Sequence, residues 1–104
     1  MAETAGPFGE PVFPDAAVDV ELDGFRQYRT TAAFEDVAKF YEKAFAGSRW
    51  IFGQRAEERG VPSASFAPGV RDTVSGWGAL VVTPIPPKGR RPSAGTHIIV
   101  TRRA

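Results

Sequence analysis

The stretch that decides the fold is residues 34–47, which read FEDVAKFYEKAFAG. Its apolar side chains recur at spacings of three, four and seven, which is the pattern of an amphipathic helix with one buried face. Thr31 stands where its hydroxyl can cap the first turn, and Gly47 stands where it can end the last turn. We therefore predict one helix over residues 32–46. Its buried stripe consists of Phe34, Val37, Ala38, Tyr41, Ala44 and Phe45, and Lys39, Glu42 and Lys43 fill the opposite side.

Short β-type segments surround this helix. Val18–Leu22 alternates apolar and polar residues, which predicts a half-buried strand. The fold class expected from one helix among so many strands is α+β, an antiparallel sheet of five or six strands with the amphipathic helix packed on one face. The predicted strands are residues 18–22, 25–30, 50–56, 63–66, 74–83 and 96–102.

The first two strands form a predicted hairpin with an open register. Asp23-Gly24 is a strong turn signal, because glycine adopts positive φ without strain. A two-residue loop pairs Leu22 with Phe25, whereas a three-residue loop pairs Val20 with Tyr28. The sequence leaves both registers open.

A chain of 104 residues has the length of one domain. Residues 1–14 are rich in Pro, Gly and Glu and predict a flexible or extended segment, which leaves residues 15–104 as a single α+β domain. The sequence has no cysteine, which excludes disulfides, thiolate metal sites and a cysteine nucleophile. No apolar run is long enough for a membrane span, and no signal peptide is visible. The expected location is cytoplasmic if Met1 is the native start, or the cell envelope if an export signal was removed.

The charges are divided unevenly along the chain. Residues 1–46 hold nine acids and four bases, and residues 47–104 hold three acids and nine bases. Such a division is compatible with a basic face for an anionic partner. The interpretation we favour is a dipolar surface whose two halves interleave in space.

The order of motifs resembles a family of small bacterial α+β domains of unassigned function, often exported or lipid-anchored. Its pattern is Pro-x-aromatic-Pro-small-Ala, a hairpin, a Val-x-x-Phe-Tyr helix and a strand that begins with Trp. The likeness covers residues 11–52, and Arg49 departs from it where a Gly usually precedes the Trp. It implies the fold and no active site, since its motifs are packing motifs. The matching residues are Pro11-Val12-Phe13-Pro14-Asp15-Ala16, Val37, Phe40, Tyr41, Phe45 and Trp50.

Candidates for catalysis or metal binding are few. His97 is the single histidine and lies in an apolar β-run, where we expect it to serve packing or solvation. Asp72, Glu57 and Glu58 are carboxylates that could pair with it, but no spacing brings them there. Ser75-Gly76-Trp77-Gly78 is not a nucleophile elbow, and its glycines predict a bulge or close packing of Trp77. We therefore predict no catalytic residue, no metal site and no cofactor.

One segment predicts an interaction. Residues 86–92, PPKGRRP, place Lys88, Arg90 and Arg91 on a loop that could contact phosphates or an acidic protein surface. The alternative is a solvated loop whose charges keep the sheet edge soluble. The function expected overall is a non-catalytic binding or accessory module for a protein or a small ligand between helix and sheet. The alternative is an anion or nucleic-acid binder that uses this basic loop.

Overall fold

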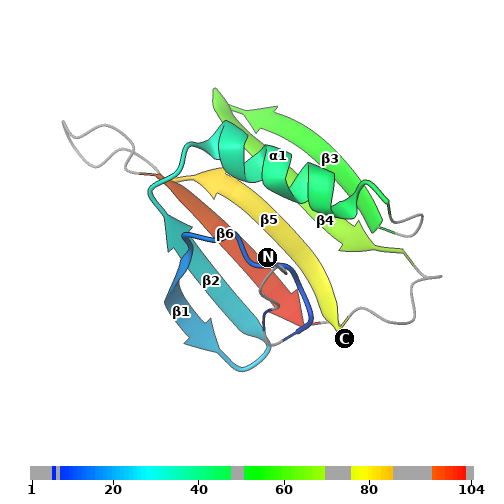
Figure 1. Cartoon of the computed structure of the whole chain (residues 1–104). Helices are drawn as coiled ribbons and strands as arrows, with labels where there is room; N and C mark the ends of the chain where they lie inside the picture. The colour runs from blue at the N-terminus through cyan, green and yellow to red at the C-terminus, as the bar shows by residue number, and fades with distance from the viewer. Residues whose placement is uncertain (1–5, 7, 48–50, 70–75, 86–94, 103–104) are drawn as a thin grey trace.

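The computed structural model describes residues 6, 8–47, 51–69, 76–85 and 95–102. These residues include six strands and one helix (Figure 1). In chain order the elements are β1 (Ala17–Leu22), β2 (Phe25–Thr30), α1 (Phe34–Phe45), β3 (Ile51–Glu58), β4 (Val61–Pro68), β5 (Trp77–Pro84) and β6 (Thr96–Arg102).

The six strands form one antiparallel sheet in the order β1-β2-β6-β5-β4-β3. The hairpin β1–β2 makes one side of the sheet, and the meander from β3 to β6 makes the other. Helix α1 leads from β2 to β3 and so carries the chain to the opposite edge (Figure 1). The prediction of an antiparallel sheet with one helix is confirmed in this form.

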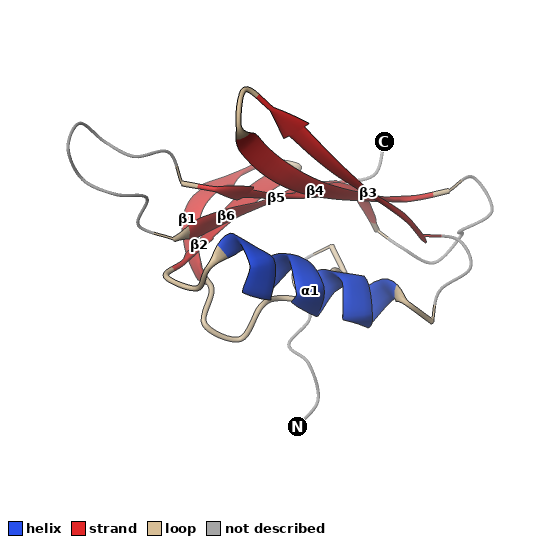
Figure 2. Ribbon diagram, turned by 90° about the horizontal axis from the view of Figure 1, so that it is seen from above, coloured by secondary structure: helices blue, strands red, loops and turns tan. Residues whose placement is uncertain are grey.

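The core lies between α1 and one face of the sheet (Figure 2). The helix contributes Val37, Ala38, Tyr41 and Phe45 to it, which confirms the main part of the predicted stripe. Phe45 is the centre of an aromatic group, since its ring centroid lies 5.2 Å from those of both Phe66 and Trp77. The sheet contributes Tyr28, Ala64, Phe66, Trp77, Leu80, Val82, Ile98 and Val100.

The helix starts two residues after the predicted position, and the predicted Thr31 cap is wrong. Helix α1 begins at Phe34 with Ala33 as its N-cap, and no side chain caps it. Ala33 is extended, with φ −67° and ψ 150°, so Thr31 lies outside the first turn. The hydroxyl oxygen of Thr30 instead accepts a bond of 3.2 Å from the Ala32 amide and orders the approach to the helix.

The first hairpin has a two-residue loop, with Leu22 paired to Phe25. The register shifts between Val18 and Val20, so Asp19 is the extra residue of a β-bulge. Because of this bulge Val18 pairs with Tyr28 and lies on the helix side, whereas Val20 and Leu22 lie on the opposite side. These sides follow from the pairing, because residues directly opposite each other in an antiparallel ladder lie on the same face of the sheet.

The second hairpin is longer than its sequence indicated. Glu58 pairs with Val61 across Arg59-Gly60, and both loop residues have positive φ, 54° and 78°. These are the angles of a type I′ turn, whose twist matches that of the strands. Pairing therefore continues from Glu58↔Val61 to Ile51↔Pro68, and β3 and β4 each reach eight residues.

The described part of the N-terminal segment packs against the helix side of the core. Phe8, Val12 and Phe13 are partly buried there. The Tyr41 hydroxyl donates a bond of 3.0 Å to the Pro11 carbonyl and accepts one of 3.3 Å from the Phe13 amide. Residues 8–13 therefore extend the core layer beside the helix.

Candidate functional site

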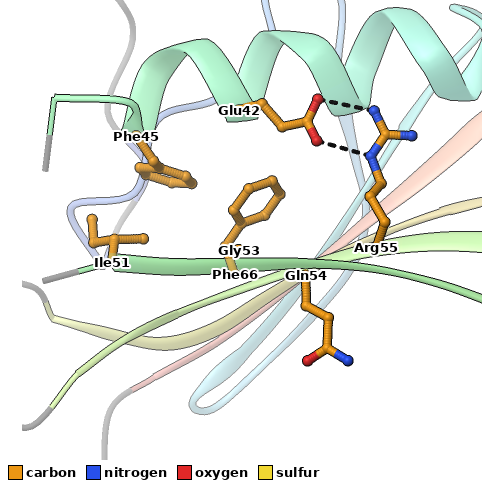
Figure 3. Close-up of a pocket in the computed structure, with 7 residues that line it drawn as sticks. All are labelled: Glu42, Phe45, Ile51, Gly53, Gln54, Arg55 and Phe66. Carbon is orange, nitrogen blue, oxygen red and sulfur yellow. Dashed lines mark hydrogen bonds and ion pairs between the residues drawn. The ribbon is translucent and has the colours of Figure 1, made fainter. Parts of the chain in front are cut away.

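A pocket of about 210 Å³ lies between the second half of α1 and the edge strand β3. Phe45, Ile51 and Phe66 make its apolar walls, and the paired side chains of Glu42 and Arg55 close one end (Figure 3). Gln54 borders the pocket through its backbone, since Figure 3 shows its side chain pointing away from the helix. A typical small-molecule site measures ~300–1,000 Å³, so this volume suits one amino-acid side chain or a very small apolar molecule.

Gly53 gives the pocket its depth. It pairs directly with Phe66, and a Cβ on Gly53 would come within 2.9 Å of the Phe66 ring. The ring therefore lies over the glycine, in the arrangement by which an aromatic residue covers a glycine in an edge strand. A side chain at position 53 would displace this ring and fill the space beside it.

Arg55 joins the sheet edge to the helix. Its guanidinium donates two bonds to Glu42, of 2.8 and 2.9 Å, and two to Glu35, of 3.0 and 3.4 Å. The two glutamates are seven residues apart, which puts them on the same side of α1 two turns apart. The guanidinium carbon also lies 5.5 Å from the centre of the Phe34 ring. This network forms a fixed polar wall at one end of an apolar pocket.

The ion pairs of this network shift the pKa values of Glu35, Glu42 and Arg55. The bonds from Arg55 lower the pKa of both Glu35 and Glu42, and the two carboxylates raise the pKa of Arg55. All three side chains are well exposed, so solvent screens each pair. The two bonds from Arg55 to Glu42 fix the orientation of both side chains rather than adding much to the stability of the fold.

The outer edge of β3 carries main-chain groups that no described strand pairs with. A two-residue hairpin loop is closed by a hydrogen-bonded pair, here Glu58↔Val61, and bonded and non-bonded pairs alternate from there. Pro62 and Pro68, which have no N–H, fall on the non-bonded pairs as this alternation requires. The N–H and C=O groups of residues 51, 53, 55 and 57 therefore point outward, away from β4.

The pocket and the free edge coincide. Ile51, Gly53 and Arg55 line the pocket on the helix face of the sheet, and the same residues direct their main-chain groups to the open side. Three other hollows have volumes of about 280–340 Å³ and lie at hairpin ends among mostly exposed or half-exposed residues. None of these three combines buried aromatic walls with an unpaired strand.

His97 meets a carboxylate other than those considered from sequence. Its Nε2 lies 3.7 Å from Oδ2 of Asp19, the bulge residue of β1, and the Gln27 amide donates a bond of 2.9 Å to the same oxygen. Glu57 and Glu58 belong to β3 at the far edge of the sheet. Asp72 lies outside the described residues. The cluster sits on the sheet face opposite the helix.

The predicted basic loop, with Lys88, Arg90 and Arg91, also lies outside the described residues. Within the part of the chain that the structure describes, no three His, Cys, Asp or Glu side chains are grouped to hold a metal ion. No helix in that part is long and apolar enough to span a membrane.

Sequence reasoning missed a buried carboxylate near the N-terminus. Glu10 is fully buried, accepting 3.2 Å and 3.0 Å bonds from the Tyr28 hydroxyl and the Phe8 amide. Burial raises the pKa of Tyr28, while the bond from Arg26 opposes that rise. These bonds hold the N-terminal segment to β2, and the sequence signal for them was absent because residues 8–10 follow no periodic pattern.

Two signals of the pocket are present in the sequence. A glycine inside a strand, such as Gly53, marks a place of close approach. The seven-residue spacing of Glu35 and Glu42 marks one side of a helix, from which both carboxylates can reach a shared partner. Comparison of the chain with protein families, curated proteins and solved structures finds no match to any of them.

Proposed function

We propose that this chain is a non-catalytic binding module of bacterial type that takes up an extended peptide segment along β3. The observation that carries the proposal is the coincidence of the outward main-chain groups of residues 51–57 with the pocket beside Gly53. In strand addition, main-chain hydrogen bonds supply affinity, and pockets for alternate side chains supply specificity. The edge of β3 offers both.

The geometry defines the peptide. A strand added antiparallel to β3 places the residue opposite Gly53 on the helix face, where its side chain enters the pocket. The walls Phe45, Ile51 and Phe66 suit an aliphatic or aromatic side chain there. Four positions along, the peptide residue lies opposite Glu57, where a Lys or Arg forms a favourable cross-strand pair. Because the peptide runs antiparallel to β3, the recognised pattern is a basic residue followed four positions later by an apolar one.

The test is selection from a displayed library of random twelve-residue peptides, followed by affinity measurement on synthetic copies. We expect selected peptides to share an apolar anchor with a basic residue four positions away. Ile51→Arg puts a charge at the mouth of the pocket and should weaken binding at least ~10-fold, since it removes an apolar wall.

Val18→Arg is the matched control, because Val18 is an exposed apolar residue on the same face at the opposite edge of the sheet. It should leave peptide affinity unchanged. Selected peptides that bind both variants equally well would contradict the proposal.

The second candidate function, binding of an anion or nucleic acid through Lys88, Arg90 and Arg91, stays a prediction from the sequence. The uneven division of charge along the chain supports it. Neither candidate requires a catalytic group, and no enzymatic activity is proposed.

A further inference from the structure

We propose that two copies of this chain associate through the face of the sheet that α1 does not cover, which we call the open face. The described N-terminal segment and the helix both lie on the other side (Figure 2). The open face therefore stands without a covering layer in the described part of the chain. This inference is independent of the peptide groove, which lies on the helix face.

The open face is apolar at its centre, and its charged side chains, Asp19, Arg29 and Glu58, lie at its margins. Among the described residues, four of the five exposed large apolar side chains lie on it, namely Val20, Leu22, Phe52 and Val61. Between them, Ile99 and Val81 are half-buried at the centre. The open-face positions of β4, β5 and β6 hold no Asp, Glu, Lys or Arg. Depletion of charge at the centre of a surface patch is the compositional mark of a protein interface.

The area is sufficient for a stable pair. Six strands at a spacing of ~4.8 Å span about 29 Å, and six to seven residues at ~3.4 Å span about 20–24 Å. The face thus covers roughly 600–700 Å² in outline, close to the ~800 Å² per partner of a standard interface. Two such faces can pack as a sandwich with ~10 Å between the sheets.

A second copy is favoured as the occupant because the pattern is self-complementary. Leu22 and Phe52, 64% and 63% exposed, are the two most exposed large apolar residues in the part of the chain that the structure describes. They lie at opposite edges of one cross-strand row, which runs through Phe25, Thr101, Ala79 and Ala67 when the β4–β5 register is continued by one residue past Phe66↔Leu80. A two-fold axis parallel to the strands places Leu22 of each copy over Phe52 of the other.

The same two-fold axis, parallel to the strands, also brings apolar residues together at the centre of the open face. The next row contains Ile99 paired with Val81 on the two middle strands, so each Ile99 faces a Val81 of the other copy. An axis across the strands would instead lay each strand over its own copy, which leaves Leu22 and Phe52 at opposite edges and unable to meet. An isologous interface requires such matching of a surface with itself. The strand-parallel axis is therefore the arrangement we propose.

The test is the oligomeric state of the full chain by sedimentation velocity from micromolar to millimolar concentration. We expect a species of twice the 11.2 kDa chain mass. Leu22→Glu and Phe52→Lys, each at a side chain about two-thirds exposed, should each raise the dimer dissociation constant at least ~10-fold while leaving the thermal melt of the monomer unchanged.

The double variant Leu22→Glu with Phe52→Lys brings a new carboxylate opposite a new ammonium of the other copy. It should dimerise at least ~10-fold more tightly than either single variant. Val18→Glu, on the helix face, should change nothing. A wild-type chain that stays monomeric at millimolar concentration, and so leaves the face to a different partner, overturns the proposal. So does a dimer that is insensitive to both single variants, or a double variant no tighter than the singles.

Discussion

Truncation of Phe45 is the most informative perturbation of the core, because this residue joins the helix, the sheet and the pocket. Its side chain is 8% exposed, and its ring stacks on Trp77 and contacts Phe66 and Tyr41. Removing a buried phenylalanine ring destabilises a domain by about 3–5 kcal/mol. Each aromatic pair contributes ~0.5–1.5 kcal/mol beyond buried area, so the loss of three contacts supports a value in the same range.

Phe45→Ala should therefore lower the free energy of unfolding by about 3–4 kcal/mol in urea titration. In a domain of this length that change corresponds to a fall in melting temperature of roughly 12–30 °C. Phe52→Ala, measured with both variants diluted until they are monomeric, is the matched control, since the same ring is removed from a site that is 63% exposed in the single chain. It should change stability by less than about 0.5 kcal/mol. A loss below about 1 kcal/mol for Phe45→Ala would refute the placement of the helix stripe against the sheet.

Three further predictions concern charge and turns. In the native fold, the bonds from Arg55 lower the pKa of Glu35 and Glu42 below its ordinary value of 4.5. Arg55→Gln should therefore reduce the free energy of unfolding most at neutral pH, and this loss should vanish as the pH falls well below 4.5. Urea titration at several pH values measures it. Arg59→Asn should stabilise the protein by about 0.5–1 kcal/mol in the same titration, because asparagine adopts the positive φ of this turn position more readily; a destabilised variant would contradict the type I′ assignment. If the bases of loop 88–91 bind polyanions, their replacement by serine should abolish retention on heparin at low salt without altering the melt, and a wild-type chain that is not retained ends that hypothesis.

The helix and the strands could be predicted from the periodicity of residues close together in the sequence. The stripe that includes Phe45 has helical period, and the alternation of β1 has strand period, so each element was predicted from residues close in sequence. The expectation that β1 is half-buried was wrong, because all six of its residues are exposed and the bulge puts Val18 on the other side from Val20. The predicted Thr31 cap was wrong because cap residues are selected by backbone angles near the helix start, which the extended Ala33 sets. Local patterns fix the type of an element better than its ends.

The sites depended on contacts between distant segments. Asp19 meets His97 only because a bulge in β1 turns its side chain to the open face. The pocket at Gly53 needs the register that sets this residue opposite Phe66, and that register is determined by the turn far along the hairpin. Neither contact has a sequence spacing that marks it. The fold was therefore largely accessible from the sequence, whereas the candidate site was not.

The proposal that β3 accepts an added strand is tested most directly by hydrogen exchange of its individual amides, measured by NMR with and without a selected peptide. In the free protein, the odd-numbered amides of residues 51–57 should exchange rapidly, and the even-numbered amides of residues 52–58, which bond to β4, should be protected. Addition of the peptide should slow the odd-numbered amides and leave the even-numbered ones as they were. Odd-numbered amides that are already protected in the free chain, or that stay unprotected at saturating peptide, would contradict strand addition at this edge.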